Sequence, residues 1–333
     1  MFFCDEEKVS RDEKRSVAFL ITLTPNCWNE FDELKSVVVC TPSALHVPDK
    51  QTATDLRWEK TADSNKMRRC FTKMVDAMSN AGVQVVDYST FLRDEERAFH
   101  EQLINRVFVR DLACVFGNHV IPGEAGTTMR RPEYIHAHKV FEQWFDEAHF
   151  SIHENDTANA LENGDVFVLS KDAVFINVGM RSSYESAKAL KDKLIPLGFT
   201  EIGVIDLPRR GDTMHLDMNL NIAGGGLALA KGYMRYFPVE ILSAKGSTYV
   251  MMHEFLHRHG YEIIWTDEVK HTVADINFLN LDPETLLIST KAHKKIFRHE
   301  RLKKKRLIEV DVDELEAGGG GLRCMTLPIE RRS

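Results

Sequence analysis

Four types of reactive side chain stand at separate places along the chain: Cys324, His215, Glu162, and the aspartates Asp111 and Asp217. A cysteine acts as a nucleophile when a base or a cation holds it as the thiolate, and the base needs a third group to orient it. His215 and Glu162 are the residue types that fill those two roles. The two aspartates suit a planar cation with several N–H donors, because carboxylates pair bidentately with guanidinium.

Cys324 follows a run of four glycines, Gly318–Gly321, which we call the glycine loop. Glycine loses more backbone entropy on folding than any other residue. An ordered run therefore implies positive φ angles or a close approach of the backbone to a ligand. The alternative for this stretch alone is a flexible turn before a buried strand cysteine. The stretch by itself does not decide between a core thiol and a functional one.

The segment Asn105–Asp111 is interpreted as an apolar strand that carries Arg110 and Asp111. A buried charge costs several kcal/mol unless it is paired, so this pattern breaks a local rule of strand composition. Such breaches concentrate at functional sites, and a purely structural ion pair is the alternative.

Hydrophobic periodicity predicts strands and helices in alternation. Short apolar runs predict strands at 37–40, 83–87, 166–169, 173–178, 201–206, 214–222, 226–230, 261–265, 277–281, 286–289 and 307–310. Apolar residues at three- and four-residue steps predict helices at about 59–81, 132–148, 183–196, 250–258 and 291–304. The order strand, strand, helix, strand recurs, which indicates one pseudo-symmetric domain. We expect that domain at residues 29–330, after an N-terminal extension over 1–28.

The composition is globular, with 43% apolar and 28% charged residues in a chain of 333. No segment approaches the ~20 apolar residues of a membrane helix, and the N-terminus does not resemble a signal peptide. The net charge of −7 disfavours nucleic acid and favours a small-molecule partner. The six cysteines form no CxxC pair, which predicts free thiols in the cytoplasm. The sequence is compatible with a homo-oligomer.

A competing motif is His253-Glu254-Phe-Leu-His257, which matches the HExxH pattern of zinc hydrolases. The longer form of that motif wants a third histidine where this chain has Ile263, inside a predicted strand. A zinc hydrolase is therefore a distant alternative, and a helix surface with titratable histidines is the simpler interpretation. The basic run 291–306 could bind an anionic partner, but a solvated helix face is the preferred interpretation.

Taken together, the motifs resemble those of the guanidino-group-modifying superfamily, which includes arginine deiminase, dimethylarginine dimethylaminohydrolase and glycine amidinotransferase. Four motifs occur in the superfamily's order, from about residue 29 to 329: Arg110-Asp111, Glu162-Asn-Gly-Asp165, His215-Leu-Asp217 and Gly-Gly-Gly-Leu-Arg-Cys324-Met. The resemblance implies an α/β fold, a five-bladed pseudo-symmetric propeller of ββαβ units called the pentein fold.

The resemblance also implies roles for individual residues. Cys324 would be the nucleophile, His215 the general acid and base, and Glu162 the carboxylate that orients His215. Asp111 and Asp217 would bind the guanidinium.

Two further positions match the residues that bind the substrate's α-carboxylate in arginine deiminases, and they hold Asn105 and Arg181 here. No cofactor and no metal are implied. The expected activity is a cysteine-dependent hydrolase acting on the guanidino carbon of arginine or a substituted arginine, through a covalent thiouronium. Amidino transfer to an amine and citrulline hydrolysis are the alternatives.

The chain departs from the deiminase pattern at Asn163, where deiminases have glycine, and at Met218-Asn219, where threonine is usual. These neighbours leave the substrate open. Amidinotransferases carry aspartate at the position of Glu162, so glutamate there favours a hydrolase.

Overall fold

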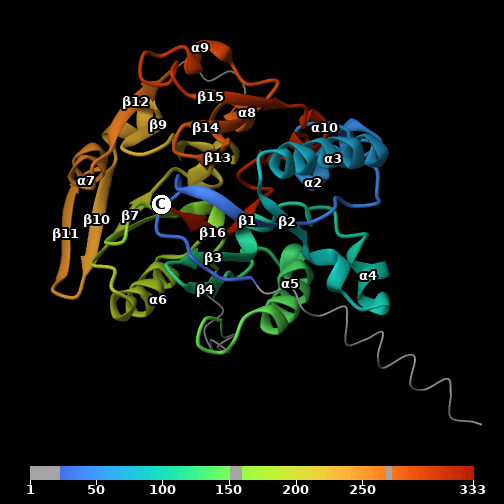
Figure 1. The fold of residues 1–333 in the computed structure, drawn as a ribbon, viewed down its shortest axis with the longest axis horizontal. Coiled ribbons are helices and arrows are strands. Elements are labelled where there is room, and N and C mark those ends of the chain that lie inside the picture. Colours follow the sequence, from blue (N-terminus) through green and yellow to red (C-terminus); the bar gives the residue numbers. More distant parts are fainter. Residues whose placement is uncertain (1–22, 151–159, 268–271) are drawn as a thin grey trace, which may run out of the picture.

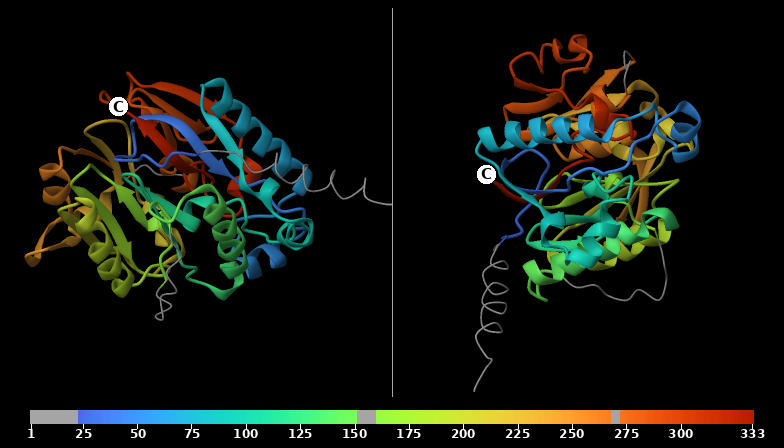
Figure 2. Two further views of the ribbon diagram at one scale, coloured as in Figure 1. Left: turned by 60° about the horizontal axis from the view of Figure 1, so that its bottom comes forward. Right: turned by 90° about the vertical axis from the view of Figure 1, so that its right-hand side faces the viewer.

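The computed structural model describes residues 23–150, 160–267 and 272–333, and within them the strands form five separate sheets (Figure 1). The first sheet joins the two ends of the described chain. Its spatial order is β16 (Leu327–Arg332), β1 (Glu33–Val39) and β2 (Gln84–Asp87), with β16 antiparallel and β2 parallel to β1. Both views of Figure 2 place the C-terminal strand beside the first one. The C-terminal segment that carries Cys324 is thereby anchored in the core.

Helices α2 (Lys50–Leu56) and α3 (Ser64–Asn80) connect β1 to β2. The apolar face of α3 was predicted from its periodicity, and its methionines at 67, 74 and 78 are fully buried. The prediction is confirmed, although the helix begins five residues later than expected because Asp63 caps it by accepting a hydrogen bond from the Lys66 amide.

The second sheet is a hairpin of β3 (Ala113–Phe116) and β4 (His119–Pro122), followed by α5 (Arg131–Trp144). Helix α4 (Asp94–His100) precedes it. The aromatic residues predicted to pack on the 132–148 helix do so, in a buried cluster that contains Tyr134, Phe141, Trp144 and Phe145.

The third sheet has five strands in the order β11, β10, β7, β6, β5. Their bounds, with that of the connecting helix, are β5 (Val166–Val168), β6 (Ala173–Val178), α6 (Tyr184–Leu194), β7 (Glu201–Asp206), β10 (Pro238–Ser243) and β11 (Gly246–Met251). The predicted strand, strand, helix, strand unit is confirmed, but the hairpin β10–β11 was missed. Its outer strand, β11, is mostly exposed and shows little alternation of buried and exposed residues. It therefore has no apolar periodicity that the sequence could reveal.

The last two sheets repeat the same order. Their elements are β8 (Leu220–Ile222), β9 (Leu227–Lys231), α7 (Met252–Arg258), β12 (Glu262–Thr266), α8 (Thr272–Ile276), β13 (Leu279–Asp282), β14 (Thr285–Ser289), α9 (Lys294–Phe297), β15 (Arg306–Val310) and α10 (Asp313–Glu316). In each sheet an antiparallel pair is extended by a parallel third strand. The helix expected over 291–304 was wrong in length, because only α9 and turns form there.

In Figure 1 the helices α3, α5, α6, α7 and α9 lie around the periphery and most strands lie inside them. The fold is therefore α/β, with apolar clusters between sheets and helices. None of its helices within the described ranges is long and apolar enough to cross a bilayer.

The expected extension over 1–28 lies mostly outside the described residues. Its last residues hydrogen-bond to the main body: Asn26 donates from its amide to the Ile329 carbonyl at 2.8 Å, and Cys27 exchanges two bonds with Gly117 at 2.7 Å each. The boundary at residue 29 stays a prediction.

The placement of Asp111 in a strand was wrong. Asp111 lies on the 3₁₀ turn η2 (Val109–Leu112), just before β3. Asp217 lies likewise on η7 (Leu216–Met218) before β8, and Glu162 directly precedes η4 (Asn163–Asp165) before β5. Every residue of Val109–Leu112 is buried, so an apolar run alone cannot distinguish this short turn from a strand. All three carboxylates thus occupy the same place, at the entry to the first strand of a unit.

Candidate active site

Six of the seven predicted site residues line one cavity of about 270 Å³: Asn105, Asp111, Glu162, Arg181, His215 and Cys324. The seventh, Asp217, is fully buried directly behind the cysteine, with its Oδ2 3.4 Å from the Cys324 Sγ. Residues more than 200 positions apart in the sequence therefore meet at one place.

The glycine loop positions Cys324 by close packing. A Cβ atom would lie 2.8 Å from the Phe108 ring at Gly318 and 2.5 Å from it at Gly320, while Gly319 has a φ of +85°. The predicted positive φ is confirmed at Gly319, while the close approach at Gly318 and Gly320 is to the Phe108 ring; an approach to a ligand stays a prediction. Beyond the loop, the Cys324 amide donates to Asn277 Oδ1 at 2.9 Å.

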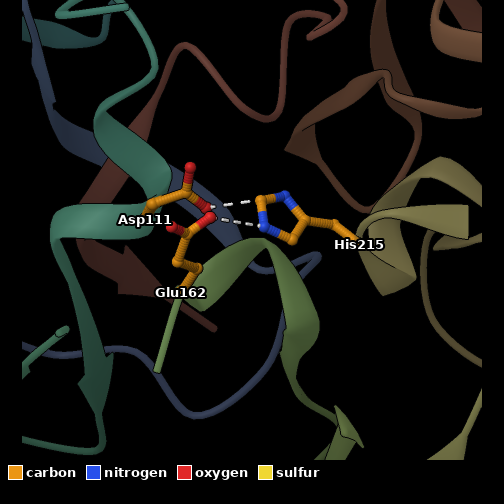
Figure 3. A group of neighbouring side chains, drawn as sticks. All are labelled: Asp111, Glu162 and His215. Carbon is orange, nitrogen blue, oxygen red and sulfur yellow. Dashed lines mark hydrogen bonds and ion pairs between the residues drawn. The ribbon is translucent and has the colours of Figure 1, made fainter. Parts of the chain in front are cut away.

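The imidazole of His215 faces two carboxylates, Asp111 and Glu162, which lie on the same side of the ring in Figure 3. Its Nε2 is 2.8 Å from Glu162 Oε2, and its Nδ1 is 3.8 Å from Asp111 Oδ1. Burial alone would lower the pKa of His215, but the charge of Asp111 and the hydrogen bond to Glu162 outweigh it and raise the pKa to about 10. The imidazole is therefore charged at neutral pH and can act as a proton donor.

Glu162 is held as an anion by its own contacts. Its Oε1 accepts a hydrogen bond from the Gly126 amide at 2.9 Å and lies 3.3 Å from the Arg181 guanidinium. Burial by itself would raise the pKa of Glu162, but the His215 hydrogen bond and the nearby arginines lower it to about 2. Glu162 thus fixes both the orientation and the charge of His215.

Asp111 has a partner that the sequence did not indicate. Arg130 places one guanidinium nitrogen 2.5 Å from Asp111 Oδ2 and donates from Nε to Glu133 Oε2 at 2.9 Å. Arg130 is 5% exposed and lines the cavity. A signal existed in the spacing, because Arg130 follows Asp111 by 19 residues and Arg181 follows Glu162 by 19. Asp111 therefore reaches the cavity with part of its charge already neutralised.

Asp217 is also paired on one side. Arg323 donates to its Oδ2 at 3.0 Å and to Glu30 Oε1 at 3.1 Å, and the guanidinium lies 3.8 Å from the centre of the Phe167 ring. The other oxygen, Oδ1, is buried and has no hydrogen-bond partner within the described residues. A buried carboxylate oxygen without a partner is an acceptor that a cationic ligand can use.

The Cys324 thiol is buried, and burial raises its pKa well above the usual value, with further contributions from Asp217 and Asp111. With these neighbours the cysteine is held as a neutral thiol. A cation bound against the two aspartates would act in the opposite direction, because it offsets their charge.

The HExxH stretch lies elsewhere. His253 and His257 are on the exposed face of α7, and Glu254 caps the helix by accepting a hydrogen bond from the Met251 amide at 2.8 Å. Among the described residues, the one group with metal-ligand spacing is Asp111, Glu162 and His215. Its carboxylates already face Arg130 and Arg181, and these guanidinium charges oppose the binding of a metal cation.

Several cavity residues were not singled out from the sequence. They are Asp55, Leu56, Arg57, Phe108, Thr127, Met129 and Met214. Met218, one of the departures from the deiminase pattern, also lines the cavity. Its neighbour Asn219 is instead structural, since it donates to the His215 carbonyl at 2.8 Å.

Comparison with known proteins identifies relatives of this architecture. A sequence model of the arginine deiminase family matches residues 32–225 and 244–331. The chain is 22% identical over 311 residues to the uncharacterized protein YkgA of Bacillus subtilis, covering 92% of this chain and 95% of that one. It is 22% identical over 334 residues to the arginine deiminase of Borrelia recurrentis, covering 83% and 75%.

Solved structures share the fold. The dimethylarginine dimethylaminohydrolase of Pseudomonas aeruginosa in complex with citrulline is similar with a TM-score of 0.64, at 19% identity over 89% of this chain and 99% of that one. The amidinotransferase SxtG of Microseira wollei is similar with a TM-score of 0.67, at 14% identity over 93% and 98%. Because the family match spans most of the chain and includes all seven predicted site positions, the protein is a member of the arginine deiminase family.

Proposed function

We propose that the protein is a hydrolase that cleaves a C–N bond at the guanidino carbon of arginine or a substituted arginine, with Cys324 as nucleophile. The observation that supports this most is the position of the thiol. It lies 3.4 Å from a buried aspartate that has one unsatisfied oxygen, and it lines the same cavity as a histidine held in its charged form. A nucleophile, a proton donor and an acceptor for a planar cation are the parts that the reaction needs.

The reaction would begin when the guanidinium binds against Asp217 Oδ1 and Asp111. Its positive charge offsets the carboxylates that raise the thiol's pKa, so Cys324 releases its proton to solvent. The thiolate then forms a bond to the guanidino carbon, giving a tetrahedral adduct. The charged His215 donates a proton to the departing nitrogen, the C–N bond breaks, and a thiouronium remains on Cys324.

The second half uses the same histidine in the opposite sense. His215, now neutral, accepts a proton from water as the water oxygen bonds to the thiouronium carbon. The C–S bond then breaks, which releases a ureido product and returns the cysteine. An amine in place of water would give amidino transfer, and this is the second candidate because both hydrolases and an amidinotransferase share the fold. Citrulline hydrolysis is a third use of the same parts.

The remaining assignments belong to the same proposal. Asn105 and Arg181 would contact the α-carboxylate, although each also has a protein partner: Asn105 Oδ1 accepts from Trp58 Nε1 at 3.1 Å, and Arg181 lies 3.3 Å from Glu162. The five sheets would be the five blades of a pseudo-symmetric propeller, forming one catalytic domain over 29–330 in a cytoplasmic protein.

A substrate screen tests the proposal. The purified protein would be incubated with arginine, methylated arginines, other guanidino compounds and citrulline, while ammonia, amines and ureido products are measured. We expect a ureido product from at least one guanidino compound and none from the Cys324→Ala variant. Release of product by Cys324→Ala at a substantial rate would disprove the covalent scheme.

A charge-matched pair of alkylating reagents tests the cation site separately. We expect 2-chloroacetamidine, which is cationic, to label Cys324 much faster at neutral pH than neutral 2-chloroacetamide, because only the cation offsets Asp217 and Asp111. Equal rates would contradict the proposed role of the two aspartates. The Cys40→Ala variant, which lacks a core thiol, serves as the control for labelling elsewhere.

A further inference from the structure

Arg323 joins two buried carboxylates, Asp217 and Glu30. Asp217 lies beside the nucleophile, whereas Glu30 is 6% exposed and is not one of the residues that line the cavity around Cys324. Glu30 also lies outside residues 32–225 and 244–331, which match the family model. The motifs of the family therefore assign no role to Glu30, and a role has to follow from its contacts.

Glu30 is surrounded by arginines. Its Oε1 accepts hydrogen bonds from Arg323 Nη2 at 3.1 Å and from the Val168 amide at 3.3 Å, and its Oε2 lies 3.9 Å from Arg110 Nη1. Burial by itself would raise the pKa of Glu30, but the charges of Arg323 and Arg110 outweigh it and hold the pKa below the usual value. Glu30 is therefore an anion at neutral pH.

The guanidinium of Arg323 is fixed by partners on several sides. It donates from Nη1 to Asp217 Oδ2 at 3.0 Å and from Nη2 to Glu30 Oε1 and to the Val166 carbonyl at 2.7 Å, and it lies over the Phe167 ring. An arginine in a protein is always charged. One permanent positive charge is thus shared between two carboxylates.

This sharing affects how strongly Asp217 attracts a ligand. If Asp217 were the only anion beside Arg323, the two charges would largely cancel, and little attraction would remain for a second cation. Glu30 takes up part of the Arg323 charge, so Asp217 keeps more of its own. Its Oδ1, which has no partner within the described residues, can then bind a cation strongly.

The same network also holds the backbone at the nucleophile. Arg323 directly precedes Cys324, and its carbonyl accepts a hydrogen bond from Arg110 Nε at 3.2 Å. The Cys324 carbonyl accepts another from the Arg110 amide at 3.0 Å. Glu30 contacts both arginines, so its charge compensates the cations that fix this turn of the chain.

We propose that Glu30 is a positioning residue of the cation site. Through Arg323 it orients Asp217 and preserves the negative charge that Asp217 offers to the guanidinium of the substrate. This rests on the proposed function, because it takes Asp217 to bind a cation. Glu30 does not line the cavity, so it acts through Arg323 and not by contact with the ligand.

The Glu30→Gln variant tests the inference, because it keeps an oxygen acceptor for Arg323 and removes the charge. Labelling of Cys324 at neutral pH by cationic 2-chloroacetamidine and by neutral 2-chloroacetamide gives two rates, and their ratio measures the preference for a cation. We expect this ratio to fall roughly three- to tenfold, because Asp217 alone then balances Arg323. The rate with 2-chloroacetamide should rise about threefold, since a less negative surrounding lowers the pKa of the thiol.

Two further variants are matched to this one. Glu30→Asp keeps the charge but withdraws it from Arg323 by one methylene, so its ratio should lie between those of the unsubstituted protein and Glu30→Gln. Glu316 is a second buried glutamate, just before the glycine loop, and its Oε2 accepts from Ser289 Oγ at 3.1 Å. Glu316→Gln should leave the ratio within about twofold, because its charge is not shared with Arg323.

The outcomes separate the inference from the proposed function. If the unsubstituted protein prefers the cationic reagent and Glu30→Gln keeps that preference, the inference falls while the cation site stands. A structural role for Glu30 would change both rates by the same factor and leave the ratio as it was. If the unsubstituted protein shows no preference, the cation site falls and the inference with it. Should Glu30→Gln fail to fold, an unchanged ratio in Glu30→Asp would overturn the inference.

Discussion

Two buried cysteine and histidine pairs in this molecule have opposite properties. Cys324 lines the same cavity as His215, whose pKa is raised to about 10. In the core, Cys40 Sγ is 3.8 Å from His100 Nε2, and burial together with Arg106 and His136 lowers the pKa of His100 to about 3. Burial is common to both pairs, so the neighbouring charges account for the difference: carboxylates raise the pKa of His215, whereas Arg106 and His136 lower that of His100.

The two thiols differ in a second way. Burial raises the pKa of both, that of Cys40 to about 12. Arg106 donates from Nε to Cys40 Sγ at 3.2 Å, so the cation beside Cys40 is permanent. The groups that further raise the pKa of Cys324 are aspartates, whose charge a bound cation can offset. Cys324 lines the cavity, whereas Cys40 is fully buried, so of these two thiols we expect a bound cation to change the reactivity of Cys324.

The largest difference in turnover between the two pairs is expected when each thiol is removed in turn. Cys324→Ala should lower turnover by about 10⁴-fold or more, because the covalent step is lost. Cys40→Ala should leave turnover within about threefold and lower the free energy of unfolding by roughly 1–2 kcal/mol, the cost of a small buried cavity. Steady-state kinetics and denaturant unfolding measure the two quantities. Similar losses of turnover in both variants would contradict the distinction between a nucleophilic Cys324 and a core Cys40.

A neutral replacement of the aspartate behind the nucleophile should have the next largest effect. Asp217→Asn should reduce kcat/KM by roughly 10²–10³-fold, because an amide cannot match the charge of the guanidinium. Asp87→Asn changes a carboxylate near the Cys40 pair, where Asp87 Oδ2 accepts from the Thr41 amide at 3.0 Å, and is the matched control. A mild effect of Asp217→Asn on kcat/KM would argue against a guanidinium substrate.

One substitution should lower the pKa of His215 and leave that of His100 unchanged. Glu162→Gln should lower the pKa of His215 below about 10, shift the alkaline limb of kcat/KM to lower pH, and reduce activity roughly 10–100-fold. Histidine resonances followed by NMR should show the change at His215 while His100 stays neutral down to about pH 3. An unchanged His215 pKa would assign its elevation to the charges of Asp111 and Asp165.

The smallest effect, on stability, should have opposite pH dependence at the two sites. The pKa of His215 is raised, so its stabilising contribution is complete below pH 6.5 and is lost as the pH rises through about 10. The pKa of His100 is lowered, so its contribution is complete above pH 6.5 and is lost as the pH falls through about 3. Each slope is at most about 1.4 kcal/mol per pH unit.

Replacing one histidine at a time separates the two slopes. Urea unfolding of His215→Gln should flatten the alkaline limb of the stability curve, and that of His100→Gln should flatten the acid limb. Flattening of the same limb by both variants would contradict the opposite pKa shifts.

Most of the reactive residues were identifiable from the sequence because their types and motif spacing are local. The strand, strand, helix, strand order was also readable, since apolar periodicity is a property of short windows. The same locality explains the errors: a short 3₁₀ turn at Asp111 reads as a strand, and the exposed strand β11 carries no apolar period.

By itself, the sequence determined which side chains could do chemistry and that a glycine loop delivers Cys324. The tertiary structure alone decided which charges are available. It pairs Asp111 with Arg130, leaves one oxygen of Asp217 without a partner among the described residues, and connects Asp217 through Arg323 to Glu30. The physical reason is that the energy of a charge depends on its distance to other charges and to water, and folding sets these distances between residues far apart in the chain.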